Sequence, residues 1–69
     1  MTTTEVQSLV RSVIVVAGLP FAIVSVNDSQ CGWRVVVRGG TGGIVRFNVA
    51  GGERDAMRWT IRKLLEAEL

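Results

Sequence analysis

Apolar residues recur along the chain at two different spacings, and the spacing changes near Pro20. Between Val6 and Ala17 they return every three or four positions, the spacing of one face of an α-helix. Thr2–Thr4 can cap the start of this helix. Gly18 tolerates the left-handed backbone that often ends a helix, and a proline soon after it prevents continuation. The pattern predicts a first helix with one apolar face.

After Pro20 the apolar spacing falls to two, which is typical of β-strands. Three segments rich in valine and isoleucine are predicted as strands: Phe21–Asn27, Cys31–Arg38 and Gly43–Val49. We expect a tight turn at Ser29-Gln30 and a five-residue loop over Gly39–Gly43, because small and polar residues favour turns. These three strands can form an antiparallel meander.

A second helix is predicted after Gly51-Gly52, beginning near Glu53. Its apolar stripe consists of Met57, Ile61, Leu64 and Leu65. The predicted order is therefore α-β-β-β-α, an α+β fold in which both helices pack on one face of a three-stranded antiparallel sheet. We expect residues 1–69 to form a single small domain.

The lengths of the two turns fix which residues face each other across the predicted sheet. The tight turn would place Val26 opposite Trp33, and the longer loop would place Val35 opposite Phe47. Both registers put the same residues of the middle strand on one side, as required where a one-residue slip exchanges the faces. The side predicted to pack under the helices consists of Ala22, Val24, Val26, Trp33, Val35, Val37, Val45, Phe47 and Val49. The side predicted to stay open consists of Phe21, Ile23, Ser25, Arg34, Val36, Arg38, Ile44, Arg46 and Asn48.

The predicted open side combines three arginines with bulky apolar residues and has no acid. One interpretation is a solvated face on which arginine stems cover valine and isoleucine. The other is an interface, because exposed apolar patches and arginine-rich surfaces often mark binding sites. The third strand also has a free edge, which a second copy of the chain could cover. The candidate protein-interface residues are Phe21, Ile23, Arg34, Val36, Arg38, Ile44 and Arg46.

Composition removes several kinds of chemistry. The 69 residues are 48% hydrophobic, carry a net charge of +2, and include one cysteine and no histidine. An internal disulfide, a Cys/His zinc site and a serine nucleophile with a histidine base are therefore impossible. The glycines at Gly39–Gly43 precede a strand instead of a helix and lack a following Gly-Lys-Ser/Thr, so we interpret them as a turn. We expect no enzyme activity, catalytic residue, metal, cofactor or small-molecule substrate.

The longest uncharged apolar run is Val13–Val24. Its twelve residues are fewer than the roughly 20 that span a bilayer, and Gly18 and Pro20 interrupt them. No small-residue cleavage site of the A-x-A kind follows the run, which disfavours a signal peptide. We expect a cytoplasmic protein with no membrane partner, in keeping with the lone free thiol of Cys31.

The element order, the Gly18-Leu19-Pro20 end of the first helix and the Gly51-Gly52 approach to the second resemble a double-stranded-RNA-binding domain. The resemblance extends over nearly the whole chain and rests on topology and spacing. It implies a sheet with both helices on one face. It also implies binding of an RNA duplex through the first helix, the loop between the first two strands and the start of the second helix.

Two of those regions depart from the family pattern. The family's loop offers a Gly-Pro-x-His type of motif, whereas Asn27–Gly32 contains no histidine. The family's second helix starts with Lys-Lys-x-Ala-Lys, whereas Glu53–Met57 keeps one cation and adds two acids. Because phosphate contacts supply most sequence-independent affinity, these differences should weaken duplex binding.

A basic stripe on the second helix is the alternative nucleic-acid surface. Its candidate residues are Arg54, Arg58, Arg62 and Lys63, with Arg11 of the first helix as a further contact. An ordinary solvated helix face, with Glu66 paired to Arg62, explains the same pattern. Two functions follow. The first is a small interaction module that binds a protein partner, or a second copy of itself as a homodimer. The second is weak, sequence-independent binding of double-stranded RNA.

Overall fold

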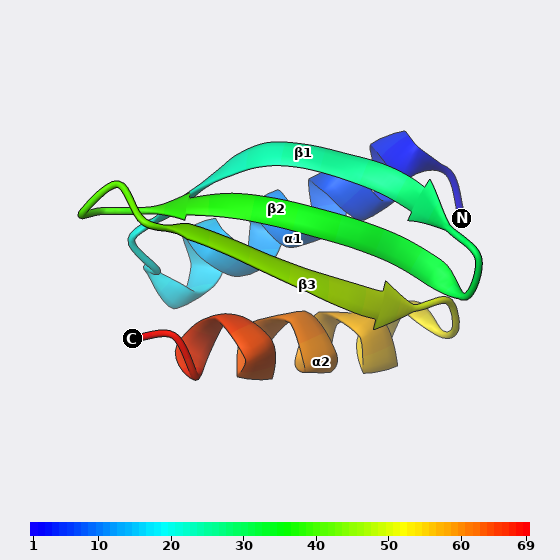
Figure 1. The fold of residues 1–69 in the computed structure, drawn as a ribbon. Coiled ribbons are helices and arrows are strands. Elements are labelled where there is room, and N and C mark those ends of the chain that lie inside the picture. Colours follow the sequence, from blue (N-terminus) through cyan, green and yellow to red (C-terminus); the bar gives the residue numbers. More distant parts are fainter.

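The computed structural model describes residues 1–69 and has the element order α-β-β-β-α (Figure 1). Helix α1 spans Thr3–Ala17 and helix α2 spans Arg54–Glu66. The strands are β1 (Phe21–Ser29), β2 (Gly32–Gly39) and β3 (Ile44–Ala50), in the spatial order β1-β2-β3. The predicted α+β class and antiparallel meander are confirmed.

Helix α1 begins and ends at the predicted residues for identifiable reasons. The Thr2 hydroxyl accepts a hydrogen bond from the Glu5 backbone N–H at 3.2 Å, and the Glu5 carboxylate accepts one from the Thr2 N–H at 3.0 Å. This reciprocal pair satisfies two donors that a helix start otherwise leaves free. Gly18 closes the helix in the left-handed conformation, with φ of 63°. Neither helix is long and apolar enough to cross a membrane.

The β2–β3 hairpin has the predicted register. Val35 lies opposite Phe47, and Trp33 lies opposite Val49. The Gly39 and Gly43 backbones close the intervening loop through a 2.8 Å hydrogen bond. The two faces of β2 and β3 are therefore those expected from the sequence.

The predicted register of β1 on β2 is wrong. The turn lies at Gln30-Cys31, so Val26 faces Val35 instead of Trp33. The pairing then shifts by one residue at a β-bulge between Ile23 and Ser25. A one-residue shift exchanges the two faces of a strand. The residues before the bulge therefore have the opposite orientation to the predicted one.

This exchange corrects four predicted positions. Phe21 and Ile23, predicted on the open side, are partly buried against the core. Ala22 and Val24, predicted in the core, are exposed. The bulge is the physical reason, because it adds an unpaired residue to β1 without a matching residue in β2.

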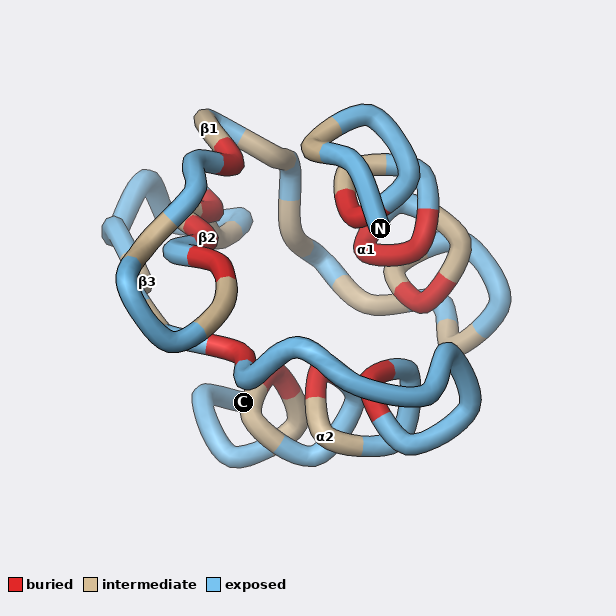
Figure 2. Tube along the Cα trace, turned by 90° about the vertical axis from the view of Figure 1, so that its right-hand side faces the viewer, coloured by how far each residue is buried: buried red, intermediate tan, exposed pale blue.

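The core lies between one face of the sheet and the two helices (Figure 2). Figure 2 shows the strands along one side of the molecule and both helices on the other, with the buried positions turned inward. The core has twelve buried residues, all of them apolar: Val6, Leu9, Val10, Val13, Val26, Trp33, Val35, Val37, Val49, Met57, Ile61 and Leu65. The opposite face of the sheet has no helix over it, as predicted.

Close packing of β2 against β3 depends on Gly32. This residue has φ of 151°, and a side-chain carbon built on it would collide with the backbone oxygen of Val49. Only glycine fits such a conformation and such an approach without strain. Gly32 therefore sets the separation of the two strands where the β1–β2 turn ends.

Candidate interaction site: the open face and the β3 edge

The candidate site is the helix-free side of β2 and β3, called here the open face. Its residues are Arg34, Val36, Arg38, Ile44, Arg46 and Asn48. Arg46 lies directly opposite Val36, and Arg34 and Arg38 flank that pair on the neighbouring strand. Diagonal neighbours of this kind have Cα atoms about 7–8 Å apart. The three arginines therefore occupy the positions next to one half-buried valine, Arg34 and Arg38 on its own strand and Arg46 opposite it.

Five of the seven predicted interface residues lie on this surface: Arg34, Val36, Arg38, Ile44 and Arg46. Phe21 and Ile23 do not, because the bulge turns them toward the core. Phe21 is the only aromatic side chain that the sequence pattern predicts on the open side, and it packs against the core, as Phe47 also does. The open face thus consists of arginine, aliphatic and amide side chains.

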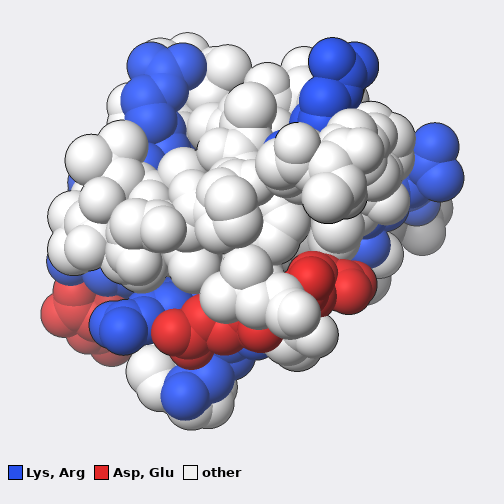
Figure 3. Space-filling view, turned by 90° about the vertical axis from the view of Figure 1, so that its left-hand side faces the viewer, with Lys and Arg blue, Asp and Glu red and all other residues white.

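The charges of the open face are uncompensated. None of the six acidic residues of the chain lies in β2 or β3. The one ion pair in the structure joins Arg62 to Glu66 at 3.3 Å on α2. Figure 3 looks at the end of the molecule that carries the β2–β3 loop and shows the acidic atoms in the lower half of the view, on the side of α2. Asp28 follows Asn27, the β1 residue opposite Arg34, but none of the three arginines forms an ion pair, so they create a local positive potential that attracts anionic partners.

The free edge of β3 adjoins the open face. Strand β3 pairs with β2 on one side only, and its seven residues continue without a bulge. Every second residue of such an edge presents its backbone N–H and C=O away from the sheet. The open face and this edge meet at Ile44 and Arg46, whose side chains are exposed.

Two of the three helix-side residues of β3 are incompletely covered, whereas the third, Val49, is buried. Val45 and Phe47 pack against the core but remain only partly buried, whereas Val35 and Val37 on β2 are fully buried. Figure 1 shows the reason: α2 runs close to the Ala50 end of β3, and the strand diverges from the helix toward Ile44. The β3 edge therefore offers apolar surface on one side and arginine on the other.

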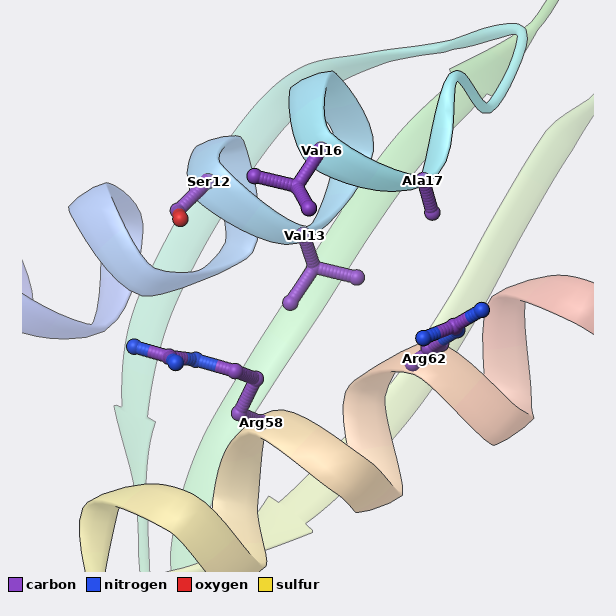
Figure 4. Close-up of a pocket in the computed structure, with 6 residues that line it drawn as sticks. All are labelled: Ser12, Val13, Val16, Ala17, Arg58 and Arg62. Carbon is purple, nitrogen blue, oxygen red and sulfur yellow. The ribbon is translucent and has the colours of Figure 1, made fainter.

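The predicted nucleic-acid residues divide between different surroundings. Arg58 and Arg62 line a shallow groove of about 80 Å³ against Ser12, Val13 and Val16 of α1 (Figure 4). In Figure 4, Arg58 extends below Ser12 and Val13, while Arg62 lies farther along α2. Arg62 is also the residue that pairs with Glu66.

Acidic or aromatic neighbours accompany other members of the stripe. Thr2 is the main cause that lowers the pKa of Glu5, through its backbone and side-chain hydrogen bonds, and the charge of Arg54 lowers it further. Lys63 lies 5.7 Å from the centre of the Trp59 ring. Arg11 is exposed on α1 but does not line the groove. The structure therefore does not gather these cations into one unopposed surface.

Two exposed apolar residues were missed by sequence reasoning. Val15 is 71% exposed and Val16 is 82% exposed on the last turn of α1. The signal was present, because residues 13–17 are all apolar and a helix that is apolar all round normally requires cover on every side. Val16 borders the groove beside Arg58 and Arg62.

The hollows of the molecule are small. Besides the groove, one hollow of about 200 Å³ lies between the end of β3 and α2, lined by Val49, Ala50, Gly51, Gly52, Ala56, Met57 and Thr60. Ligand pockets typically measure about 300–1,000 Å³. No group of three or more His, Cys, Asp or Glu side chains lies together, and Cys31 is exposed in the β1–β2 turn.

Comparison of the chain with protein-family models, with curated proteins and with solved structures finds no match in any of the three. The geometry and charge of the open face and the β3 edge are therefore the basis for assigning a function.

Proposed function

We propose that this chain is a small, non-enzymatic protein-interaction module that binds its partner through the open face and the β3 edge. The single observation that favours this function is the combination of arginines, a half-buried valine and a free strand edge at one surface. Three arginines that form no ion pair occupy positions around Val36, beside a strand edge with no partner. Surfaces rich in arginine with exposed aliphatic groups are typical of interfaces.

The partner is either another protein or a second copy of the chain, and cytoplasmic location remains part of the proposal. A second copy stacked face to face would bring six arginines together, because each copy contributes Arg34, Arg38 and Arg46. Like charges in direct apposition oppose association. We therefore expect two copies to associate through the β3 edge and not through the open face.

Two measurements test this function. Selection from a random-peptide library should yield peptides whose binding is lost in Val36→Asp and kept in Trp59→Asp, since Trp59 lies on α2 away from the open face. Sedimentation velocity over a range of concentrations tests the second copy. Dissociation of an oligomer by Ile44→Asp, with the monomer still folded by circular dichroism, supports self-association. Failure to select any such peptide, together with a monomer at all concentrations, would overturn the proposed function.

The second candidate is weak binding of double-stranded RNA by a domain of the family that the sequence resembles. Its support is the element order together with Arg54, Arg58 and Arg62, which recur every fourth residue on α2. The neighbouring Glu66 and the two acids at Glu53 and Asp55 oppose it. A salt titration of duplex binding tests it, because phosphate contacts weaken steeply as salt rises. No binding at low salt would remove this candidate.

A further inference from the structure

The β3 edge has the geometry that accepts an additional strand. Its seven residues, Ile44–Ala50, extend over about 23 Å of regular backbone. It has no proline and no bulge, two of the features that natural edges use to prevent pairing, and its one charged residue, Arg46, lies on the open side. Backbone hydrogen bonds to such an edge supply affinity, and side chains at alternate positions supply specificity.

The two sides of this edge call for different side chains in the added strand. On the helix side, Val45 and Phe47 are only partly buried. An apolar residue of the added strand would cover them there and gain about 25 cal/mol for each Å² removed from water. Because successive side chains of a strand point to opposite faces, such residues must occupy every second position.

On the open side, β3 presents Ile44, Arg46 and Asn48 to the added strand, and Arg34 and Arg38 lie one strand farther in. Opposite charges on neighbouring strands contribute about 0.2–1 kcal/mol per pair, and like charges are destabilising. The position of the added strand opposite Arg46 should therefore be acidic, and the positive potential of Arg34 and Arg38 favours acidic residues at the neighbouring positions on this side.

Two other occupants fit less well. A second β3 would present Ile44, Arg46 and Asn48 on the open side and would bring no acid to Arg46. A single-stranded nucleic acid would supply anions, but sheets that bind it stack its bases on aromatic side chains. The open face has no aromatic side chain.

We propose that the β3 edge binds an extended segment of another protein in which acidic and apolar residues alternate, so that the segment adds a fourth strand to the sheet. This inference rests on the proposed function and specifies its partner. The acidic residues lie on the side of Arg46, one of them opposite it, and the apolar residues cover Val45 and Phe47.

The test uses three capped seven-residue peptides titrated into the ¹⁵N-labelled chain. The first alternates Glu and Val, the second alternates Lys and Val, and the third has the composition of the first with all Glu residues placed before the Val residues. We expect the alternating Glu-Val peptide to bind most tightly, to shift the amide signals of residues 44–48 and to slow their hydrogen exchange. Its affinity should fall as salt is raised.

Matched variants locate the contact. Arg46→Ala should weaken the Glu-Val peptide about two- to fivefold, whereas Arg58→Ala, on α2, should leave its affinity unchanged. Arg46→Glu should make the Lys-Val peptide the tighter ligand. Val45→Lys should abolish binding, because an inward-pointing charge at an edge blocks strand addition. Circular dichroism of each variant verifies that the fold is retained.

The outcomes separate this inference from the proposed function. Equal binding of the Glu-Val and Lys-Val peptides, or signal changes centred outside β3, would overturn the inference. If library peptides still bind in a manner lost on Val36→Asp, the proposed function survives that result. If no peptide of any kind binds, both fail. Tighter binding of a seven-nucleotide oligouridine than of the Glu-Val peptide would overturn the inference in favour of nucleic acid.

Discussion

The two edge strands of the sheet, β1 and β3, differ in how regular their backbones are. Strand β1 has nine residues, contains a bulge at Val24, and follows directly after Pro20. Strand β3 has seven residues, runs without interruption, and diverges from α2 along its length. A bulge twists an edge and breaks the row of pairing groups, whereas a regular edge leaves that row intact.

This difference indicates which edge can bind. The helix-side cover of the two strands is alike: β1 has the buried Val26 with the partly buried Phe21 and Ile23, and β3 has the buried Val49 with the partly buried Val45 and Phe47. The bulge therefore distinguishes the two edges, and the regular edge of β3 is the one that remains available for pairing. A pair of substitutions and a deletion test the two strands, and a fourth variant concerns α1, in order of decreasing expected effect.

A valine-to-alanine substitution should lower the free energy of unfolding more at the buried Val26 of β1 than at the partly covered Val45 of β3. Val26→Ala removes two methylene equivalents from a buried site and leaves a cavity, so we expect the free energy of unfolding to fall by about 2.5 kcal/mol. Val45→Ala acts at a half-covered site and should cost about 1 kcal/mol. Urea denaturation followed by circular dichroism measures both. Equal losses would contradict the incomplete cover of β3.

Deletion of Val24 should make β1 resemble β3. The pairing on either side of the bulge differs by one residue, so the deletion joins the two registers and keeps every other β1 side chain on its present face. We expect a folded chain, changed in stability by about 1 kcal/mol. We also expect more self-association at high concentration than in the unaltered chain. Sedimentation velocity measures this. A folded deletion variant with unaltered association would show that the bulge does not protect the edge.

The smallest expected effect concerns the start of α1, the helix that packs against β1. The hydrogen bonds of Thr2 hold the pKa of Glu5 below its ordinary value near 4.5. A carboxylate with a lowered pKa in the folded state stabilises the fold fully above its ordinary pKa, and this contribution is lost as the pH falls through the lower folded value. Glu5→Gln should therefore melt at a slightly lower temperature than the unaltered chain at pH 7.

The difference in melting temperature between these two chains should shrink as the pH falls below 4.5. Thermal unfolding followed by circular dichroism at a series of pH values measures it. A constant difference across that range would show that the ionised carboxylate has no part in the cap.

The β2–β3 hairpin could be predicted because its sequence contains independent constraints that agree. The loop of glycines fixed its length, and both faces were patterned, with Arg34, Arg38 and Arg46 on one side and apolar residues on the other. A charged residue cannot be moved to the core at low cost, so the pattern permitted a single register. The five open-face residues on these strands were predicted for the same reason.

The β1–β2 hairpin lacked those constraints. Before Asn27, β1 consists of Phe, Ala, Ile, Val, Ser and Val, with Ser25 as the only polar residue. Either face of such a segment can be buried, so the sequence pattern could not reveal a bulge. The turn also lies one residue later than predicted. This difference displaces the pairing of β1 with β2 by two residues, which leaves each side chain on the same face. The assignment of Phe21 and Ile23 to the interface failed because of the bulge alone.

Gly32 places a lasting constraint on how this chain can vary. The Val49 oxygen occupies the space that any side chain at Gly32 would need, whereas Gly51 and Gly52 have open space around them. A library of variants, or a search for distant homologues, should therefore require glycine at position 32 and allow other residues at positions 51 and 52. Of the eight glycines, Gly32 is required by the close approach of the β3 backbone, whereas Gly51 and Gly52 have room for a side chain.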